Sequence, residues 1–570
     1  MEIKGIGVSP GIAIGKACVI KKKQAAVTGI LLIDDAEIAV EIERFDNAVL
    51  LAISEIESIK NNTVLADKDI AILETHIELI GDPQIKDDVT ELITAEKKNA
   101  NDALIQVTQN MIELFRNMDD EYMQARAADM EDIGNRILKH LIGADTLATQ
   151  KFEPGTIIIA EDLSPSDTIT MDLSCIIGFA TRAGSTTSHS AIIARARGLP
   201  AVVGCSAALM DVQDGDAVIV DGTRGALYVN ADDETIRQLK IKREQFIMQT
   251  AKLKQLKDTP AVTTDGTAIV LSANISGAAD MDDVFYHGGE GVGLFRTELL
   301  FMNRDTFPME DEQFEFYKQT ALKAKGKPVI VRTIDIGGDK QIPYFDLPVE
   351  ENPFLGYRAI RICLDREDIF ITQLKAILRA SVFGELKIML PMIAGVQELR
   401  QTKGIIEKAK NQLSKDNIAF NHNIKLGIMI EIPSAAITAD ILAKEVDFFS
   451  IGTNDLCQYT LAVDRMNEKI AHLYDPFNLG VLRLISNIIE QANKHQIHVG
   501  MCGEMAGDPL ATILLLGMGL KEFSMSATSI PTIKNNIIHT DMAEAKQVCE
   551  KVMEFDNPDD IKTYLQQFIK

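Results

Sequence analysis

Basic side chains follow several apolar runs in the second half of this 570-residue chain. Arg296 follows GVGLF, Arg332 follows PVIV, and Lys340 and Arg465 lie in polar stretches farther along. The guanidinium forks of arginine match the oxygens of phosphate and carboxylate groups. A single arginine of this kind usually forms a surface ion pair. Several at successive strand ends instead favour a binding site for an anionic substrate.

Two carboxylates occupy comparable places. Glu431 lies near the end of the run LGIMIEI, and Asp455 ends VDFFSIGTND. Two such groups beside substrate oxygens are the arrangement that Mg²⁺ favours in proteins. The alternative is that both carboxylates only pair with the arginines.

A thiol, Cys502, lies near the end of HVGMCGE. Thiols titrate close enough to neutrality to act as proton donors or as nucleophiles, although a buried and inert cysteine is the commoner case. Cys457 is a comparable thiol three residues after Asn454. Only the position of Cys502 at a predicted strand end favours it over Cys457.

His189 lies in a hydroxyl-rich segment, GSTTSHSAIIAR, at residues 184–195. A glycine and several hydroxyl groups lead there into a predicted helix start, where free amides and the helix dipole stabilise negative charge. The pattern therefore suggests a histidine that carries a phosphoryl group. A structural histidine beside an ordinary helix cap is the alternative.

Eight apolar runs separated by helical patterns position most of these side chains. This count over about 300 residues is what a (β/α)₈ barrel requires, and its active site would lie at the carboxyl ends of the strands. Asn274, Asn454 and Ser526 are further polar residues near run ends. The runs are residues 268–275, 291–298, 328–335, 386–393, 426–432, 446–455, 498–504 and 522–527.

The first half of the chain changes pattern twice. Apolar residues recur every three or four positions from residue 34 to about residue 143, which predicts an all-helical subdomain over residues 21–145. Gly-Asp-Pro at residues 81–83 predicts the end of one of its helices. Short strands on both sides, in residues 1–20 and 146–230, predict one small α/β domain that the helical segment interrupts. Residues 231–260 predict a linker helix closed by Pro260, and the barrel takes 261–570. The predicted fold class is a multidomain α/β protein.

The composition and net charge restrict the classes of binding partner and the cell compartment that we expect for this chain. A net charge of −25 disfavours nucleic acid and anionic membranes, and favours a basic protein partner. The apolar run at 513–520 is too short for membrane insertion. Seven scattered cysteines without a CxxC pair are typical of a reducing compartment. We therefore expect a cytoplasmic protein.

Several stretches together resemble enzyme I of the bacterial sugar phosphotransferase system, the phosphoenolpyruvate-protein phosphotransferases. They are TSHSAIIAR, GVGLFRTELLFM, RTIDIGGDK, ENPFLGYRAIR, DFFSIGTNDL, YTLAVDR and GMCGEMAGD. The resemblance runs through the whole chain. It implies a swivelling phosphohistidine domain, an inserted helical subdomain that binds the phosphocarrier protein HPr, and a phosphoenolpyruvate-binding barrel that forms a homodimer.

The resemblance also implies roles for single residues. His189 would be phosphorylated, and Cys502 would protonate the enolate at carbon to complete pyruvate. Mg²⁺ would be held by Glu431 and Asp455. Thr168 matches a family position near the histidine. The residues that would contact phosphoenolpyruvate are Arg296, Arg332, Lys340, Asn454, Asp455 and Arg465.

One departure and two alternatives accompany this resemblance. The family usually has Gly-Gly-Arg-Thr-Ser-His where this chain has Gly-Ser-Thr-Thr-Ser-His, so Ser185 and Thr186 replace a glycine and an arginine. A regulatory paralogue with inefficient transfer would explain the change. Pyruvate, phosphate dikinase and phosphoenolpyruvate synthase share the histidine domain and barrel, but they need an ATP-binding domain for which this chain has no Gly-rich nucleotide loop.

Overall fold

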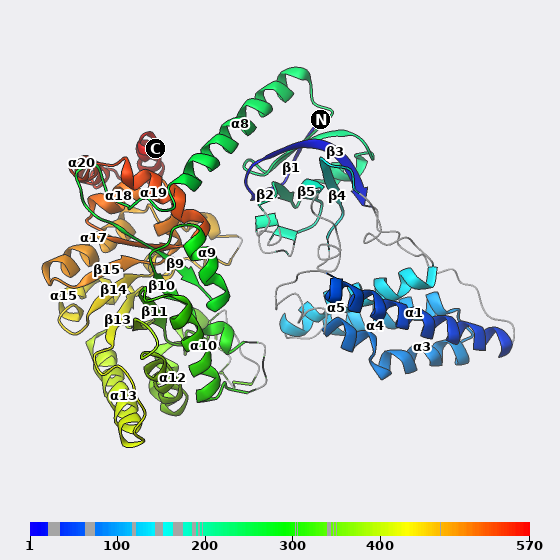
Figure 1. Ribbon diagram of the computed structural model, residues 1–570, viewed down its shortest axis with the longest axis horizontal. Coiled ribbons are helices and arrows are strands. Elements are labelled where there is room, and N and C mark those ends of the chain that lie inside the picture. Colours follow the sequence, from blue (N-terminus) through cyan, green and yellow to red (C-terminus); the bar gives the residue numbers. More distant parts are fainter. Residues whose placement is uncertain are drawn as a thin grey trace. The chain divides into compact units, whose positions relative to one another are not determined.

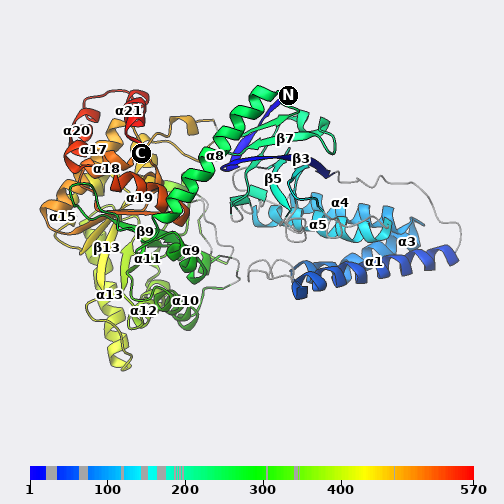
Figure 2. The same ribbon diagram turned by 45° about the horizontal axis from the view of Figure 1, so that its top comes forward.

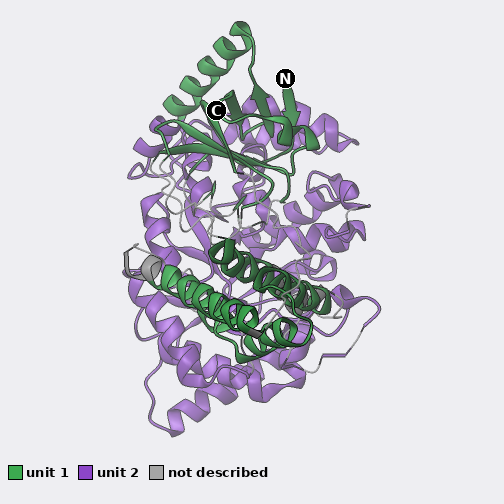
Figure 3. Ribbon diagram, turned by 90° about the vertical axis from the view of Figure 1, so that its right-hand side faces the viewer, with its two compact units in different colours: residues 1–249 green, residues 250–570 purple. Residues whose placement is uncertain are grey.

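The computed structural model of the chain divides into two compact units, residues 1–249 and 250–570, coloured separately in Figure 3. Each unit has hydrophobic clusters of its own. The structure describes residues 1–20, 35–62, 75–116, 121–142, 152–163, 175–184, 188, 190–191, 194–195, 198–302, 304, 306–338, 344–345, 347–348, 350–467 and 469–570.

The second unit is a closed barrel of eight parallel strands, in which β16 pairs with β9 to complete the ring (Figure 1). Every run predicted as a strand is present, and the predicted (β/α)₈ barrel is confirmed. The strands are β9 (Val270–Ile275), β10 (Val292–Phe295), β11 (Val329–Arg332), β12 (Leu386–Leu390), β13 (Lys425–Ile430), β14 (Phe448–Ile451), β15 (His498–Met501) and β16 (Glu522–Met525).

Barrel strands are covered on both faces, which explains why their sequences are apolar runs and do not alternate. All four residues of β11, VIVR, are buried. Because the strands are parallel, their carboxyl ends meet at one end of the barrel, which we call the mouth. The opposite end, where the strands begin, we call the bottom.

Helices cover the outside of the barrel. In α17, buried residues recur with helical spacing from Val481 to Ala492, and Asn478 caps the helix by accepting a hydrogen bond from the Gly480 amide at 2.8 Å. The helices are α9 (Met281–Tyr286), α10 (Glu310–Lys323), α11 (Ile360–Asp365), α12 (Glu367–Ala380), α13 (Val396–Lys415), α14 (Pro433–Ile437), α15 (Ala439–Leu442), α16 (Thr453–Leu461), α17 (Leu479–Lys494), α18 (Thr512–Gly517), α19 (Ile530–Ile538), α20 (Met542–Val552) and α21 (Pro558–Leu565).

The first unit contains an eight-stranded mixed sheet in the order β1-β8-β7-β3-β4-β5-β6-β2. Strands from before and after the helical segment pair directly, since β3 is parallel to β4 and antiparallel to β7. The predicted insertion of a helical subdomain into an α/β domain is therefore confirmed. The strands are β1 (Glu2–Lys4), β2 (Ile6–Ser9), β3 (Ile12–Ile20), β4 (Thr156–Ala160), β5 (Ile176–Thr181), β6 (Ala201–Val203), β7 (Ala217–Asp221) and β8 (Ala226–Val229).

The inserted helices α1 (Asp35–Asn62), α3 (Pro83–Ala95), α4 (Ala100–Arg116) and α5 (Glu121–Ile142) lie side by side in Figures 1 and 2. They share one apolar core. Helix α3 differs from expectation, because Gly-Asp-Pro at residues 81–83 predicts only the end of a helix and not the start of another. Asp82 also caps a new helix by accepting from the Gln84 amide at 2.8 Å, and Pro83 fits its first turn.

Helix α8 (Asp233–Gln255) follows the sheet, where the charged linker helix was predicted. The chain just beyond its last turn is held by the buried Lys534 ammonium, which donates to the carbonyls of Leu256 at 3.2 Å and Lys257 at 2.8 Å. The numerical domain limits given above stay predictions. Among the described residues, no helix combines the length and the apolar character needed to cross a membrane.

Candidate active site

The barrel mouth collects the polar residues that the sequence places at strand ends. Each lies directly after a strand, at its last residue, or in the first turn of the following helix, and parallel strands bring these positions together. They are Arg296 after β10, Arg332 at the end of β11, Glu431 after β13, Asn454 and Asp455 in the first turn of α16, and Cys502 after β15.

A network of buried ion pairs links three of the mouth loops. The Arg332 guanidinium contacts Glu298 at 2.6 Å and Asp335 at 3.1 Å. Asp335 also accepts from Arg358 at 2.9 Å, and Arg358 reaches Asp455 at 3.4 Å. Arg332, Asp335 and Arg358 each contact two groups of opposite charge, so the ion pairs form one continuous network.

Arg465 adds a further cation to this network. It lies just after α16, and its guanidinium is 3.5 Å from the second oxygen of Asp455. Arg296 differs, because its side chain is exposed and has no ion pair with any part of the chain that the structure describes. A cation left uncompensated at the mouth is available to an anionic ligand.

Glu431 is the most buried carboxylate of the predicted metal pair, with 2% of its surface exposed. Burial, together with the negative charges of Asp455 and Asp335, raises its pKa to about 8. One oxygen accepts a hydrogen bond from the Met392 amide at 2.6 Å. Met392 has a φ of 58°, a left-handed conformation that is strained for a non-glycine residue.

Glu431 and Asp455 fit a magnesium ion. Mg²⁺ usually takes one or two protein carboxylates and completes its shell with water and substrate phosphate. The described residues contain no group of three or more His, Cys, Asp or Glu side chains able to hold a metal, so a site enclosed by protein ligands is not found among them. A cation between these two carboxylates would offset the repulsion that raises the pKa of Glu431.

Cys502 faces the same charged groups. The residue is 3% exposed, and burial raises the pKa of its thiol to about 11, while the charges of Arg332, Glu431 and Arg296 act on it from nearby. The Sγ–H group donates to the Ile451 carbonyl at 3.8 Å. A thiol that stays protonated at neutral pH suits proton donation better than nucleophilic attack.

The backbone around Cys502 is tied to neighbouring strand ends. The Asn274 amide donates to its carbonyl at 3.0 Å. Asn454 and Glu504 exchange two hydrogen bonds, of 3.1 and 3.0 Å. At Gly503, a Cβ atom would lie 1.8 Å from the Thr453 hydroxyl, so only glycine allows the two loops to approach this closely.

Not every predicted residue can be placed. His189, Lys340 and Thr168 lie outside the described residues, as do Ser185 and Thr186. Cys457 is fully buried in the barrel's apolar core, as the interpretation of an inert cysteine requires. No pattern in the sequence marks Glu298, Asp335 or Arg358 as members of this network. All three lie within quoted motifs, GVGLFRTELLFM, RTIDIGGDK and ENPFLGYRAIR, but their ion pairs, which reach partners up to 97 positions away, appear only in the fold.

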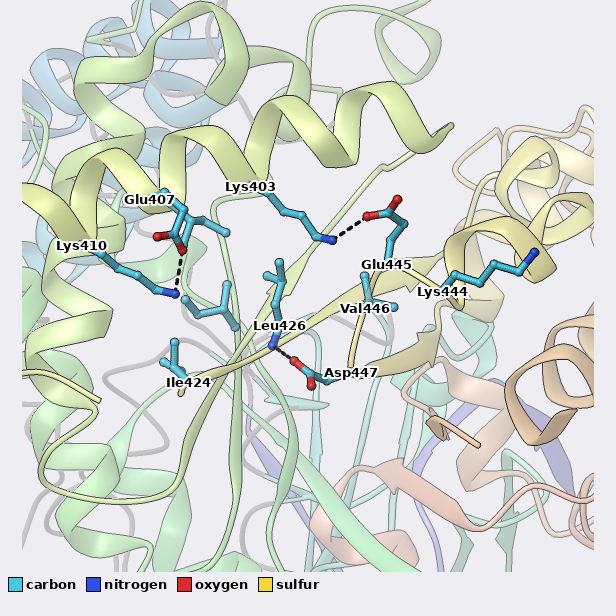
Figure 4. A pocket seen from close by; sticks show the side chains of 11 residues that line it. Lys403, Glu407, Lys410, Ile424, Leu426, Lys444, Glu445, Val446 and Asp447 are labelled. Carbon is cyan, nitrogen blue, oxygen red and sulfur yellow. Dashed lines mark hydrogen bonds and ion pairs between the residues drawn. The ribbon is translucent and has the colours of Figure 1, made fainter. Parts of the chain in front are cut away.

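A cavity of about 480 Å³ lies at the bottom of the barrel, between α13 and the starts of β13 and β14 (Figure 4). Its carboxylates are already paired within the chain. Glu445 accepts from Lys403 at 2.8 Å, and Glu407 accepts from Lys410 at 2.9 Å. This bottom cavity is therefore separate from the mouth and does not collect the predicted site residues.

Comparison with known proteins bears on what the mouth does. A family model described as PEP-utilising enzyme, PEP-binding domain, matches residues 250–542, which carry the barrel. The corresponding N-terminal model matches residues 4–126, and the mobile-domain model matches residues 152–225. The phosphoenolpyruvate-protein phosphotransferase of Bacillus subtilis (strain 168) is 45% identical over the full length of both chains.

The chain belongs to the phosphoenolpyruvate-protein phosphotransferase family. The relative from Staphylococcus carnosus (strain TM300) is 44% identical and covers 100% of this chain and 99% of its own. Among solved structures, the solution structure of Enzyme I (nEIt) is 37% identical and covers 43% of this chain and 99% of its own, with a TM-score of 0.38. Family membership rests on the sequence relatives and not on that partial superposition.

Proposed function

We propose that this chain transfers the phosphoryl group of phosphoenolpyruvate to His189, releasing pyruvate, and then to a histidine of the carrier protein HPr. The observation that carries the proposal is the mouth constellation. A buried, protonated Cys502 thiol lies among cations and a carboxylate pair suited to Mg²⁺. Full-length similarity to named phosphoenolpyruvate-protein phosphotransferases supports it.

Each group has a distinct task in this reaction. Arg296, Arg332 and Arg465 bind the phosphate and carboxylate oxygens, with Lys340 as a further cationic contact and Asn454 as a hydrogen-bond donor. Glu431 and Asp455 would hold Mg²⁺, which would supply positive charge to stabilise the phosphoryl group.

The transfer itself moves one phosphoryl group and one proton. An imidazole nitrogen of His189 attacks phosphorus as the bond from phosphorus to the enolate oxygen breaks. Cys502 donates its proton to the enolate carbon, so pyruvate leaves, and the thiolate later regains a proton from water. The buried network of Arg332, Asp335 and Arg358 holds the cations in place without reorganisation during the reaction.

The partners follow from the same reaction. The helical subdomain, about residues 21–145, would dock HPr; exposed apolar side chains on its helices support a docking role, among them Leu50 at 64% and Leu114 at 58% exposure. A chain with a net charge of −25 would attract a basic carrier.

We further propose that the protein is cytoplasmic and forms a homodimer through the barrel domain, residues 261–570. Residues 1–20 and 146–230 would together form the phosphohistidine domain.

The test is phosphorylation with labelled phosphoenolpyruvate and Mg²⁺, followed by addition of HPr. We expect one acid-labile phosphoryl group per chain in the wild type and none in His189→Ala. His287→Ala is the control, since the imidazole of that histidine bonds to the Asp283 carbonyl of its own helix. Label on another histidine in His189→Ala would contradict the assignment.

A second function is favoured by the altered loop at Ser185 and Thr186. A regulatory paralogue would be phosphorylated slowly or in less than stoichiometric amount. Restoring the family residues, with Ser185→Gly and Thr186→Arg together, would then speed phosphorylation strongly. Rapid and stoichiometric phosphorylation of the wild-type chain in a single-turnover experiment would exclude this alternative.

A further inference from the structure

A fully buried primary amide lies behind the carboxyl ends of β10 and β11. It belongs to Gln373, in α12. Its oxygen accepts a hydrogen bond from the Ile334 backbone amide at 2.9 Å. Its nitrogen donates to the Thr297 hydroxyl at 3.2 Å and to the Tyr317 hydroxyl at 3.1 Å. These four residues are called the Gln373 hub below.

The orientation of this amide is fixed by its partners. A backbone N–H group can only donate, so the oxygen of Gln373 must face Ile334. Both hydrogens of the nitrogen then meet hydroxyl oxygens that use their own hydrogens elsewhere. Thr297 donates to the Arg332 carbonyl at 2.9 Å, and Tyr317 donates to the Gln313 side chain at 3.3 Å. Among the common side chains, only an amide offers one acceptor and two donors in this arrangement.

The hub connects the two loops that carry substrate-binding cations. Thr297 directly follows Arg296, and its hydroxyl group bonds to the carbonyl of Arg332. Ile334 directly precedes Asp335, the ion-pair partner of Arg332. One side chain from an outer helix therefore sets the spacing between the ends of two neighbouring strands.

We propose that Gln373 is a positioning residue that sets the relative placement of Arg296 and Arg332 for the anionic groups of phosphoenolpyruvate. The inference rests on the proposed function for the identity of the substrate. Gln373 itself touches neither substrate nor metal; it acts through Thr297 and Ile334.

The hub continues outward through buried groups. Tyr317 is fully buried in α10, and its partner Gln313 donates to the Pro308 carbonyl at 3.0 Å. Since none of these polar groups reaches water, losing one partner leaves another unsatisfied in the interior. The loops consequently have little freedom to adjust while the hub is intact.

The test is steady-state kinetics of phosphoenolpyruvate-dependent HPr phosphorylation by Gln373→Met, which preserves length but removes all three hydrogen bonds. We expect KM for phosphoenolpyruvate to rise about tenfold while kcat changes less than about twofold, as when binding geometry alone is lost. The control is Asn536→Leu, which removes another buried amide, bonded to Pro509 at 3.1 Å and to the Lys570 amide at 3.2 Å. It should lower the melting temperature without changing KM.

An unchanged KM in a folded Gln373→Met protein, or an equal rise in Asn536→Leu, would overturn the proposal. If Gln373→Met does not fold, Tyr317→Phe takes its place, with an expected rise in KM of about threefold and Thr402→Val as its buried-hydroxyl control. An unchanged KM there would also overturn it. A wild-type chain that phosphoenolpyruvate does not phosphorylate would instead refute the proposed function.

Discussion

The ion pairs at the barrel mouth and those that line the bottom cavity differ in how far they are exposed to water. At the mouth, Asp335 is shared by two arginines, Arg332 and Arg358, and all three are less than a tenth exposed. At the bottom cavity, Lys410 and Glu407 form a simple pair in which the carboxylate is 62% exposed (Figure 4).

We interpret this difference as one between charges held for the proposed reaction and charges that only cover a surface. Removing one partner of a buried pair leaves an uncompensated charge in the interior, which is strongly destabilising. Exposed pairs contribute little, because water and salt screen them. The buried charges at the mouth therefore cost folding free energy in the free protein. An anionic substrate bound with a cation would compensate them.

The largest effect should come from Cys502. Replacing it with alanine removes the proposed proton donor, so we expect pyruvate release to slow about 10²- to 10⁴-fold, the usual contribution of a positioned acid. Cys457→Ala is the matched control, because that thiol is equally buried but lies in the apolar core. Equal losses in both variants would contradict a chemical role for Cys502.

The protonation state of Cys502 offers a second measurement on the same group. Burial raises its pKa to about 11, so the thiol keeps its proton as the pH rises past the ordinary value of about 8.5. Alkylation by iodoacetamide, which requires the thiolate, should therefore stay slow at pH 9. Rapid alkylation there, with protection by substrate, would mean that the mouth activates the thiol as a nucleophile.

The next effect concerns the metal requirement. Glu431→Gln should raise the Mg²⁺ concentration for half-maximal phosphorylation of the chain by at least about tenfold, since one of two proposed carboxylate ligands is lost. The control at the other end of the barrel is Glu445→Gln, which removes a carboxylate already paired with Lys403. The same Mg²⁺ titration in Glu431→Gln as in the wild type would exclude the proposed ligand.

The sequence allowed the barrel and much of its mouth to be predicted for one physical reason. Doubly covered parallel strands produce continuous apolar runs, and the first polar residue after each run, such as Arg296 or Glu431, marks the mouth. Arg358 follows no strand directly. It reaches Asp455 only because the barrel closes, and no local pattern records a contact between residues 97 positions apart.

Helix α3 was missed for a different reason. Gly-Asp-Pro ends one helix and begins the next. When the glycine and proline are interpreted only as helix breakers, the capping role of Asp82 at the start of α3 is overlooked. The amide of Gln373 is an ordinary helical residue in sequence, and its burial against two strand ends appears only in the fold.

A smaller effect is expected from Glu522, which lies at the bottom, at the start of β16. Burial alone would raise the pKa of Glu522, but its hydrogen bond with His498, the charge of that histidine and the Ser272 hydroxyl, which donates at 2.6 Å, lower it below the usual value. Glu522→Gln should therefore cost about 1–3 kcal/mol of unfolding free energy near pH 7.

The pH dependence of that cost has a definite sign. A carboxylate with a depressed pKa stabilises the fold above its unfolded pKa of about 4.3, and this contribution is lost as the pH falls through the lower folded-state value. The difference between Glu522→Gln and the wild type should therefore shrink in acid, as measured by urea unfolding. Glu385→Gln, which removes a half-exposed partner of Lys387, should show no such trend.

The smallest effect should follow from Lys403→Met, which breaks a pair that lines the bottom cavity. The ammonium is 34% exposed and Glu445 keeps Arg400 as a second partner at 2.8 Å, so the carboxylate is not left alone. Exposed pairs of this kind contribute at most about 1 kcal/mol. We expect an unfolding free energy within about 0.5 kcal/mol of the wild type, because methionine preserves the aliphatic contacts of the stem. Unchanged kinetic constants for phosphoenolpyruvate should accompany it. A large loss of turnover would mean that the bottom of the barrel is coupled to the mouth, and the division between the two ends drawn from their ion pairs would be wrong.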